Sequence, residues 1–136
     1  MIAYLDTNVA VWLAQGNLAR IPAPTLEVVE HAELLISPMV LVELEYLYEV
    51  KRTRFSARTI QLKLAHELGV RVCDLAFPLV AEVMLDEKWT RDPFDRMIVS
   101  QAKANGLATL ISADQEIAAN YPRTVWERAA PGPTGV

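Results

Sequence analysis

Short apolar runs that alternate with segments of helical spacing constrain the fold of this chain more than any other feature. Residues 2–5 form the first run, a second follows at residues 34–36, and mainly apolar segments follow at residues 70–73 and 108–111. The helices expected between or after these segments include residues 7–14, 38–51 and 78–87, and Ser37 before Pro38 is expected to cap the second of these helices. Runs of this length between helical segments are typical of buried strands. Strands connected through helices favour a parallel sheet with helices on both faces. We therefore expect an α/β fold, a three-layer α/β/α sandwich.

The length of the chain predicts a single domain. Its 136 residues, 52% of them hydrophobic, suffice for one buried core and are too few for two. We assign residues 1–128 to this domain and expect an edge strand at residues 124–126. Residues 129–136 contain two prolines and two glycines and are expected to form a disordered tail.

Nothing in the sequence indicates export or membrane insertion. The lone Cys73 cannot form an internal disulfide, and the first residues lack a basic stretch before an apolar run. No apolar segment approaches the roughly 18 to 20 residues that a spanning helix needs. We expect a cytoplasmic protein with no membrane partner.

Two acidic residues stand in apolar helical surroundings. Glu43 falls on the apolar face of the helix expected over residues 38–51, and Asp95 shares a helix face with Ile98 and Val99. Burying an unpaired carboxylate is costly, so Glu43 is expected to have a partner. An acid that only complemented the helix dipole would be exposed, which favours a functional role for Asp95.

Two further acids follow predicted strands. Asp6 comes directly after the first apolar run, and Asp114 follows the run at residues 108–111. Open parallel sheets bind ligands beyond the carboxyl ends of their strands. Either residue alone could instead be a helix cap, and Asp92, directly before Pro93, is expected to be one.

A shared pocket for these four acids requires positive charge. At an effective dielectric of about 20, two carboxylates about 4 Å apart repel by roughly 4 kcal/mol. A divalent metal is the expected source, because Mg²⁺ and Mn²⁺ prefer carboxylate and water oxygens. Such an ion also lowers the pKa of a bound water and neutralises charge on a reacting phosphate.

The overall charge limits how nucleic acid could be bound. A net charge of −4 argues against a broad basic binding surface, but it is compatible with a metal-dependent nuclease. One compact basic run exists; such a run is more often a solvated helix end than a nucleic-acid contact, but it is the best candidate in this sequence for an RNA contact. Its members are Lys51, Arg52, Arg54 and Arg58.

These motifs resemble those of the PIN-domain ribonucleases, and within them the VapC-type toxins of bacterial toxin–antitoxin pairs. The resemblance covers about residues 1–126. Tyr4-Leu5-Asp6-Thr7-Asn8 resembles the opening strand and first metal aspartate of the family, and residues 37–44 resemble the helix with its glutamate. Asp92-Pro93-Phe94-Asp95-Arg96 is the most specific stretch and is similar to one VapC branch. Residues 110–114 resemble the closing strand and fourth acid, with Ser112 where the family often has Thr.

The resemblance implies a PIN-like fold with a five-stranded parallel sheet and a Mg²⁺- or Mn²⁺-dependent endoribonuclease that uses one or two ions. It implies that Asp6 and Asp95 bind the metal and that Glu43 and Asp114 complete the catalytic acidic pocket. The hydroxyl of Thr7 is expected to support Asp6 or a metal-bound water. The implied partners are an RNA substrate, a small inhibitory antitoxin and a second copy of the chain.

Several alternatives stay open. Asn8 could support the site or only cap a helix. A phosphatase with an aspartate nucleophile also places an aspartate after its first strand, but it wants a second one where Asn8 stands. A non-catalytic module could hold an inert acidic site and act by sequestering a partner.

Overall fold

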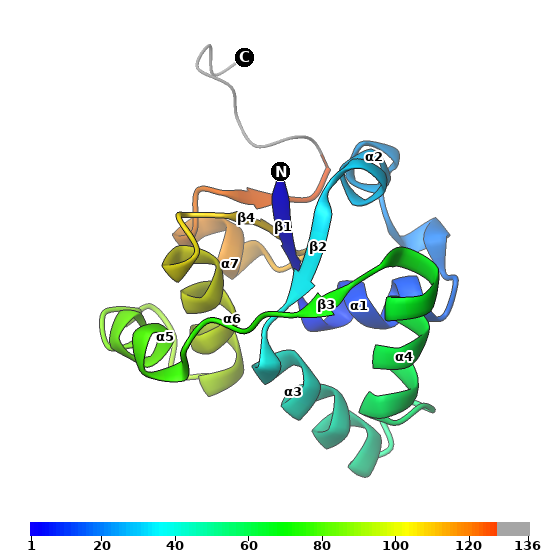
Figure 1. The fold of residues 1–136 in the computed structure, drawn as a ribbon, viewed down its shortest axis with the longest axis horizontal. Coiled ribbons are helices and arrows are strands. Elements are labelled where there is room, and N and C mark those ends of the chain that lie inside the picture. The colour runs from blue at the N-terminus through cyan, green and yellow to red at the C-terminus, as the bar shows by residue number, and fades with distance from the viewer. Residues whose placement is uncertain (128–136) are drawn as a thin grey trace.

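Five parallel strands in the order β3-β2-β1-β4-β5 form the central sheet of the computed structural model, which describes residues 1–127 (Figure 1). The parallel sheet predicted from the sequence is thereby confirmed. The expected tail at residues 129–136 lies outside the described residues, so the domain boundary stays a prediction. The strands are β1 (Ile2–Leu5), β2 (Glu33–Ile36), β3 (Arg71–Val72), β4 (Thr109–Ile111) and β5 (Thr124–Val125).

Helices pack around this sheet, as expected of an α/β sandwich. Figure 1 shows the strands between a group that includes α1 and α4 and a group that includes α5, α6 and α7. A short 3₁₀ helix at Leu18–Arg20 was not expected from the sequence. The α-helices of residues 1–127 are α1 (Thr7–Ala14), α2 (Ala23–His31), α3 (Pro38–Glu49), α4 (Ala57–Leu68), α5 (Phe77–Met84), α6 (Pro93–Ala104) and α7 (Gln115–Asn120).

Capping residues define the ends of the helices that matter for the site. The Ser37 hydroxyl accepts a hydrogen bond from the Met39 backbone N–H at 3.1 Å, and Pro38 occupies the first helical position of α3. Helix α4 ends at Gly69, whose φ of 67° is in the left-handed region that glycine adopts without steric cost. These residues determine where α3 begins after β2 and where α4 ends before β3.

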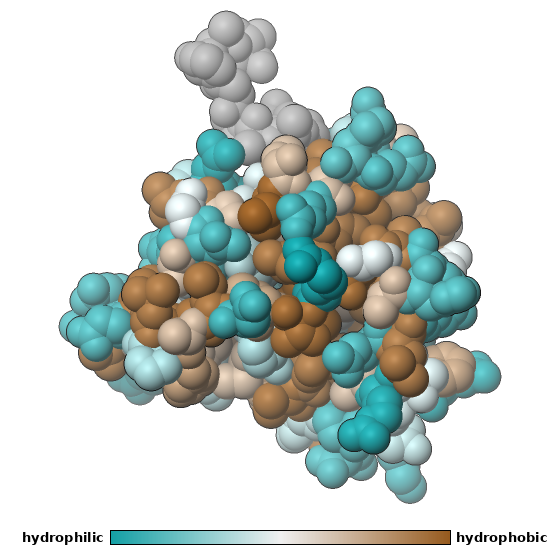
Figure 2. Space-filling view, viewed as in Figure 1, coloured by the Kyte–Doolittle hydropathy of each residue, from teal (hydrophilic) through white to brown (hydrophobic). Residues whose placement is uncertain are grey.

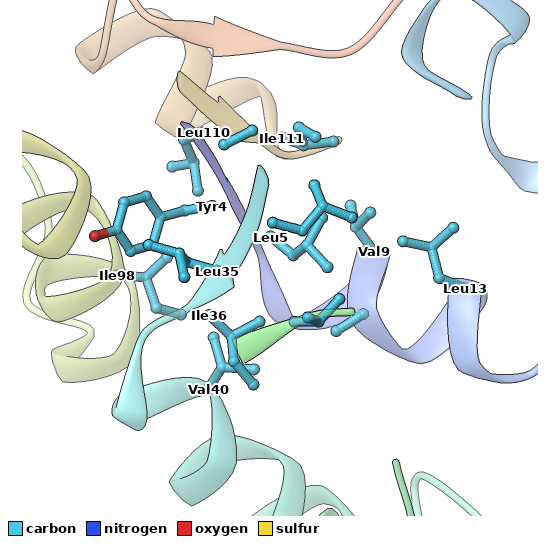
Figure 3. Close-up of a cluster of buried hydrophobic side chains, with 14 of the residues drawn as sticks. Tyr4, Leu5, Val9, Leu13, Leu35, Ile36, Val40, Ile98, Leu110 and Ile111 are labelled. Carbon is cyan, nitrogen blue, oxygen red and sulfur yellow. The ribbon is translucent and has the colours of Figure 1, made fainter. Parts of the chain in front are cut away.

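The core lies on both faces of β1. Tyr4 and Leu5 are 1% and 0% exposed, and successive strand residues point to opposite faces. In Figure 3, Leu5 lies toward Val9 of α1, whereas Tyr4 lies toward Ile98 of α6. Burial on both faces explains why the sequence of β1 is a continuous apolar run instead of an alternation of apolar and polar residues.

A buried polar network anchors α6 to the sheet and to the start of α3. The Tyr4 hydroxyl lies 3.1 Å from Cys73 Sγ and accepts a hydrogen bond from Asn105 Nδ2 at 2.8 Å. Gln101 Nε2 donates to Cys73 Sγ at 3.2 Å, and Ser37 Oγ donates to Gln101 Oε1 at 2.9 Å. These bonds hold α3 and α6, which carry two of the candidate acids, in a fixed relation.

The viewed surface is of mixed character. Figure 2 shows hydrophilic and hydrophobic residues interspersed over this face. Across residues 1–127, no helix combines the length and apolar composition needed to cross a membrane.

Candidate active site

The carboxyl ends of β1 and β4 lie side by side at the centre of the sheet. Leu5 pairs with Ile111, while the other edge of β1 pairs with β2. The strand order therefore reverses direction between β1 and β4, which is the topological switch point where such sheets bind ligands. Asp6 directly follows β1 and Asp114 follows β4 by three residues, so both lie at this point.

Asp6 is the most firmly held of the four acids. It is 8% exposed, and its Oδ1 accepts a hydrogen bond from the Thr7 backbone N–H at 2.8 Å. Its Oδ2 accepts one from Ser112 Oγ at 2.6 Å. Ser112 Oγ in turn accepts from the Asp114 backbone N–H at 3.1 Å. The Ser112 hydroxyl thus joins the two strand ends and fixes the plane of the Asp6 carboxylate.

Glu43 has the partner that its place on an apolar helix face led us to expect. Thr7 Oγ1 donates to Glu43 Oε1 at 2.5 Å. Of the two roles expected for the Thr7 hydroxyl, a bond to Asp6 is not found: the Thr7 backbone N–H bonds Asp6, and the hydroxyl bonds Glu43 of α3. The other role, support of a metal-bound water, stays a prediction. Asn8 is exposed, and its side chain makes no hydrogen bond to residues 1–127, which supports neither capping nor a bond to the acids.

Asp92 and Asp95 have the separate environments expected of them. Asp92 Oδ1 accepts from the backbone N–H groups of Phe94 at 2.8 Å and Asp95 at 3.3 Å, which confirms Asp92 as the N-cap of α6. The Asp95 side chain is partly buried, and none of residues 1–127 donates a hydrogen bond to its carboxylate. Its oxygens therefore stay available for a ligand.

Asp114 serves as a helix cap as well as a member of the acidic group. Its Oδ1 accepts from the backbone N–H groups of Glu116 at 2.8 Å and Ile117 at 3.1 Å at the start of α7. The capping explanation that the sequence left open for Asp114 therefore applies. The cap uses one carboxylate oxygen, so the other is free of it.

The acids influence one another electrostatically. Burial, and after it the charges of Asp92, Asp6, Asp114 and Glu43 in that order, together raise the pKa of Asp95 to about 7. Burial likewise raises the pKa of Asp6, with repulsion from Asp114 and Asp92 adding to the effect of burial. The pKa of Glu43 is raised first by burial and then by Asp6 and Asp92. Acids from distant parts of the sequence thus share one electrostatic environment.

No salt bridge neutralises these acids within residues 1–127, where the ion pairs present involve other carboxylates. Arg52 is the basic residue whose charge lowers the pKa of Glu43. It belongs to the predicted basic run, which is exposed in the turn after α3 and at the start of α4; the run comprises Lys51, Arg52, Arg54 and Arg58. The run directly follows α3, the helix that carries Glu43.

The donor chemistry of the site fits a hard divalent cation. Every candidate ligand is a carboxylate, the group that Mg²⁺ and Mn²⁺ prefer, and the raised pKa values of three acids mean that added positive charge would be favourable. In their present positions, however, no three His, Cys, Asp or Glu side chains of residues 1–127 form a group that could hold an ion. Ligation by three or more of these acids therefore requires side-chain movement, and the Asp95 carboxylate has no hydrogen bond within residues 1–127 that would oppose it.

Two polar residues that position the site were not identified from the sequence. Ser37 was expected only to cap α3, but it also bonds Gln101 on α6. Gln101 is 3% exposed. An amide within the apolar stripe of a predicted helix is a signal that could have been noticed, because such a group needs a buried partner.

Comparisons with known proteins agree with this fold. A family model described as the PIN domain matches residues 3–121. No curated protein sequence matches the chain. One similar structure is a chain of VapBC2 from Rickettsia felis, crystallised with a DNA fragment from its promoter. Its sequence is 22% identical to this chain, the TM-score is 0.57, and the match covers 94% of this chain and 98% of that chain. A chain of DNA-bound VapBC from Salmonella typhimurium is 17% identical with a TM-score of 0.53, covering 91% and 95%.

Proposed function

Because the chain belongs to the PIN domain family, we propose that it is a metal-dependent endoribonuclease, a VapC-type toxin restrained by a cognate antitoxin. The observation that carries this proposal is the electrostatic coupling of Asp6, Glu43, Asp95 and Asp114 at the switch point of the sheet, without a salt bridge to neutralise them among residues 1–127. Neighbouring carboxylates that are largely buried and have no positive partner destabilise a fold, so a bound cation explains why they are present.

The proposed roles follow from how each side chain is held. Asp6 and Asp95 would ligate one or two Mg²⁺ or Mn²⁺ ions, with Glu43 and Asp114 as further direct or water-mediated ligands. When bound, such an ion supplies a more acidic water and neutralises charge on the phosphodiester. Ser112 and the Thr7 amide orient the Asp6 carboxylate, and the Thr7 hydroxyl orients Glu43. Asp92 holds the first turn of α6, and with it Asp95.

The proposed partners fit the charge of the pocket. An antitoxin could inhibit by placing an Arg or Lys side chain among the acids, because an acidic pocket attracts positive charge. The similar VapBC chains were crystallised as complexes, which supports a protein partner for this chain. The exposed basic run around Arg52 is the proposed RNA contact, and we further propose a cytoplasmic homodimer.

The experiment that tests the proposal is an RNA cleavage assay. The protein, purified free of any antitoxin, is incubated with single-stranded and structured RNA in Mg²⁺, Mn²⁺ or EDTA. We expect cleavage that EDTA abolishes and that Asp6→Asn and Asp95→Asn each remove. Asp86→Asn is the matched control, because Asp86 is an exposed aspartate outside the acidic group.

Two outcomes would count against the nuclease. Equal cleavage by the wild type and Asp6→Asn would identify a contaminating enzyme. Metal binding without cleavage of any RNA would favour the non-catalytic acidic module.

A further inference from the structure

A pocket of about 550 Å³ lies directly beside Asp114, between the β4–α7 connection, α7 and the end of β5. Ser112 and Asp114 form part of its lining, so it adjoins the candidate active site. Trp126 lines it as well. Its volume is within the range of about 300–1,000 Å³ that is typical of ligand pockets.

Trp126 is held in place as an aromatic part of this lining. Its ring packs against Trp12 of α1 with centroids 5.7 Å apart and planes tilted by 48°. The Arg20 guanidinium lies 5.1 Å from the centroid of the Trp12 ring, a cation–π contact that adds to the packing. Trp126 is only partly buried, so part of its surface is available to a ligand.

The charge of the lining decides which part of a nucleotide the pocket suits. Asp114 and Glu127 contribute carboxylates, and none of the lining residues is a Lys or Arg. A phosphate group would be repelled here, whereas a neutral, flat ring with hydrogen-bond donors would be accepted. The side chain of Gln115, which is exposed, adds an amide that can donate or accept.

We propose that this pocket binds a nucleobase of single-stranded RNA, with Trp126 as a stacking surface, next to the phosphate that the acidic group cleaves. The inference rests on the proposed function, because the acids give the pocket its place beside a scissile phosphate. A base must be free of a duplex to enter such a pocket and stack on an aromatic side chain. The pocket therefore selects unpaired RNA, and Asp114 is shared between the pocket and the acidic group.

Binding is measured with the full-length Asp6→Asn protein, so that the RNA stays uncut. The probes are a fluorescent single-stranded RNA of mixed sequence and the same RNA in a duplex. Because loss of one base–aromatic stack weakens binding by about 5- to 150-fold, we expect Trp126→Ala to reduce affinity for the single strand within this range. Trp126→Phe should keep most of the affinity, and duplex binding should not change.

Two further variants test whether weaker binding by Trp126→Ala reflects the pocket and not a general loss of structure. Ala118→Trp fills the pocket from α7 and leaves Trp126 in place, so it should also weaken single-strand binding while the melting temperature is kept. Phe77→Ala removes an aromatic side chain that is 66% exposed and outside the pocket, and it should leave binding unchanged.

The outcomes separate this inference from the proposed function. If wild-type protein cleaves RNA and both Trp126→Ala and Ala118→Trp cleave with an unchanged KM, the pocket does not bind the base and the inference is overturned alone. If wild-type protein cleaves no RNA with any metal, the nuclease proposal is what fails. A raised KM with a retained kcat in both variants supports the pocket.

Discussion

Replacing Asp95 with asparagine should stabilise the metal-free protein while removing its activity. In the folded protein, burial and four neighbouring acids raise the pKa of Asp95 from 3.8 to about 7. The folded state therefore carries a penalty whenever this carboxyl is ionised. Asparagine has nearly the same shape and no charge, so Asp95→Asn removes the penalty.

The size of the effect follows from the shift in pKa. A rise of about 3 pKa units corresponds to at most about 4 kcal/mol, at about 1.36 kcal/mol per unit. Asp95 is only partly buried, and solvent screening reduces such interactions, so we expect a gain of about 1–2 kcal/mol at pH 8.

The sign of the pH dependence is a further test of the same reasoning. A raised pKa means that the folded state binds the Asp95 proton more tightly than the unfolded chain does. Below about pH 4 the carboxyl is protonated in both states and carries no penalty. As the pH rises from about 4 to 7, wild-type protein loses stability relative to Asp95→Asn, and above about 7 the difference is constant.

Urea denaturation in EDTA at several pH values measures this difference. Asp86→Asn is the control for the loss of one surface charge. Adding Mn²⁺ should reverse the order, because wild-type protein gains about 2.7 kcal/mol at an ion concentration 100 times the Kd. A less stable Asp95→Asn in EDTA at pH 8, or a difference that does not vary between pH 4 and 7, would refute the electrostatic account of the acidic group.

Substitutions at three other positions test separate parts of the structure. Ser112→Ala removes the 2.6 Å bond to Asp6 and should weaken Mn²⁺ binding, measured by calorimetry, by about 1.5–3 kcal/mol. Ser112→Thr keeps a hydroxyl and should restore the affinity. Equal Mn²⁺ affinity of the wild type and both variants would contradict the orienting role of Ser112. Glu43→Gln should keep the circular dichroism spectrum and melting behaviour but lower Mn²⁺ affinity, and unchanged affinity would remove Glu43 from the site. Leu5→Ala, at a side chain with no exposure, should cost about 2–5 kcal/mol in urea denaturation, and a cost below about 1 kcal/mol would mean that the core around β1 is not packed as described.

The sequence was most informative where local chemistry and burial agree. The apolar run before Asp6 and the helix after it were predicted with the bounds that the structure has, because both faces of β1 are buried. The Ser37-Pro38 and Asp92-Pro93 helix starts were also found, since a cap and a proline leave little freedom.

Predictions from the sequence were weaker where long-range contacts decide the structure. The helix starting near Pro78 was expected to run to about Glu87, but α5 ends at Met84. Glu87 is 3% exposed and bonds Trp89 and Lys103, so its contact with α6 outweighs its local helical spacing. The helix expected to reach Lys51 ends at Glu49, and Lys51 adopts a left-handed backbone with φ of 62°.

The same limit applies to the site. The ends of β1 and β4 are visible in the sequence, so Asp6 and Asp114 could be placed at one edge. The Thr7 hydroxyl bond to Glu43 could not be predicted, because it joins residues 36 positions apart whose meeting depends on how α3 packs against α1. Local spacing contains no information on that packing.

The hydroxyl of Ser112 ties the first acid to the neighbouring strand, and this has a consequence for how the protein tolerates change. The position of the Asp6 carboxylate depends on the alignment of two adjacent backbones, so a substitution far away that loosens the middle of the sheet should disturb the candidate site and lower the stability of the fold together. Strand β5 takes part in the same arrangement, because the Ser112 backbone N–H donates to the Val125 carbonyl oxygen at 3.2 Å. Surface turns that make no bond to these strands tolerate substitution more readily.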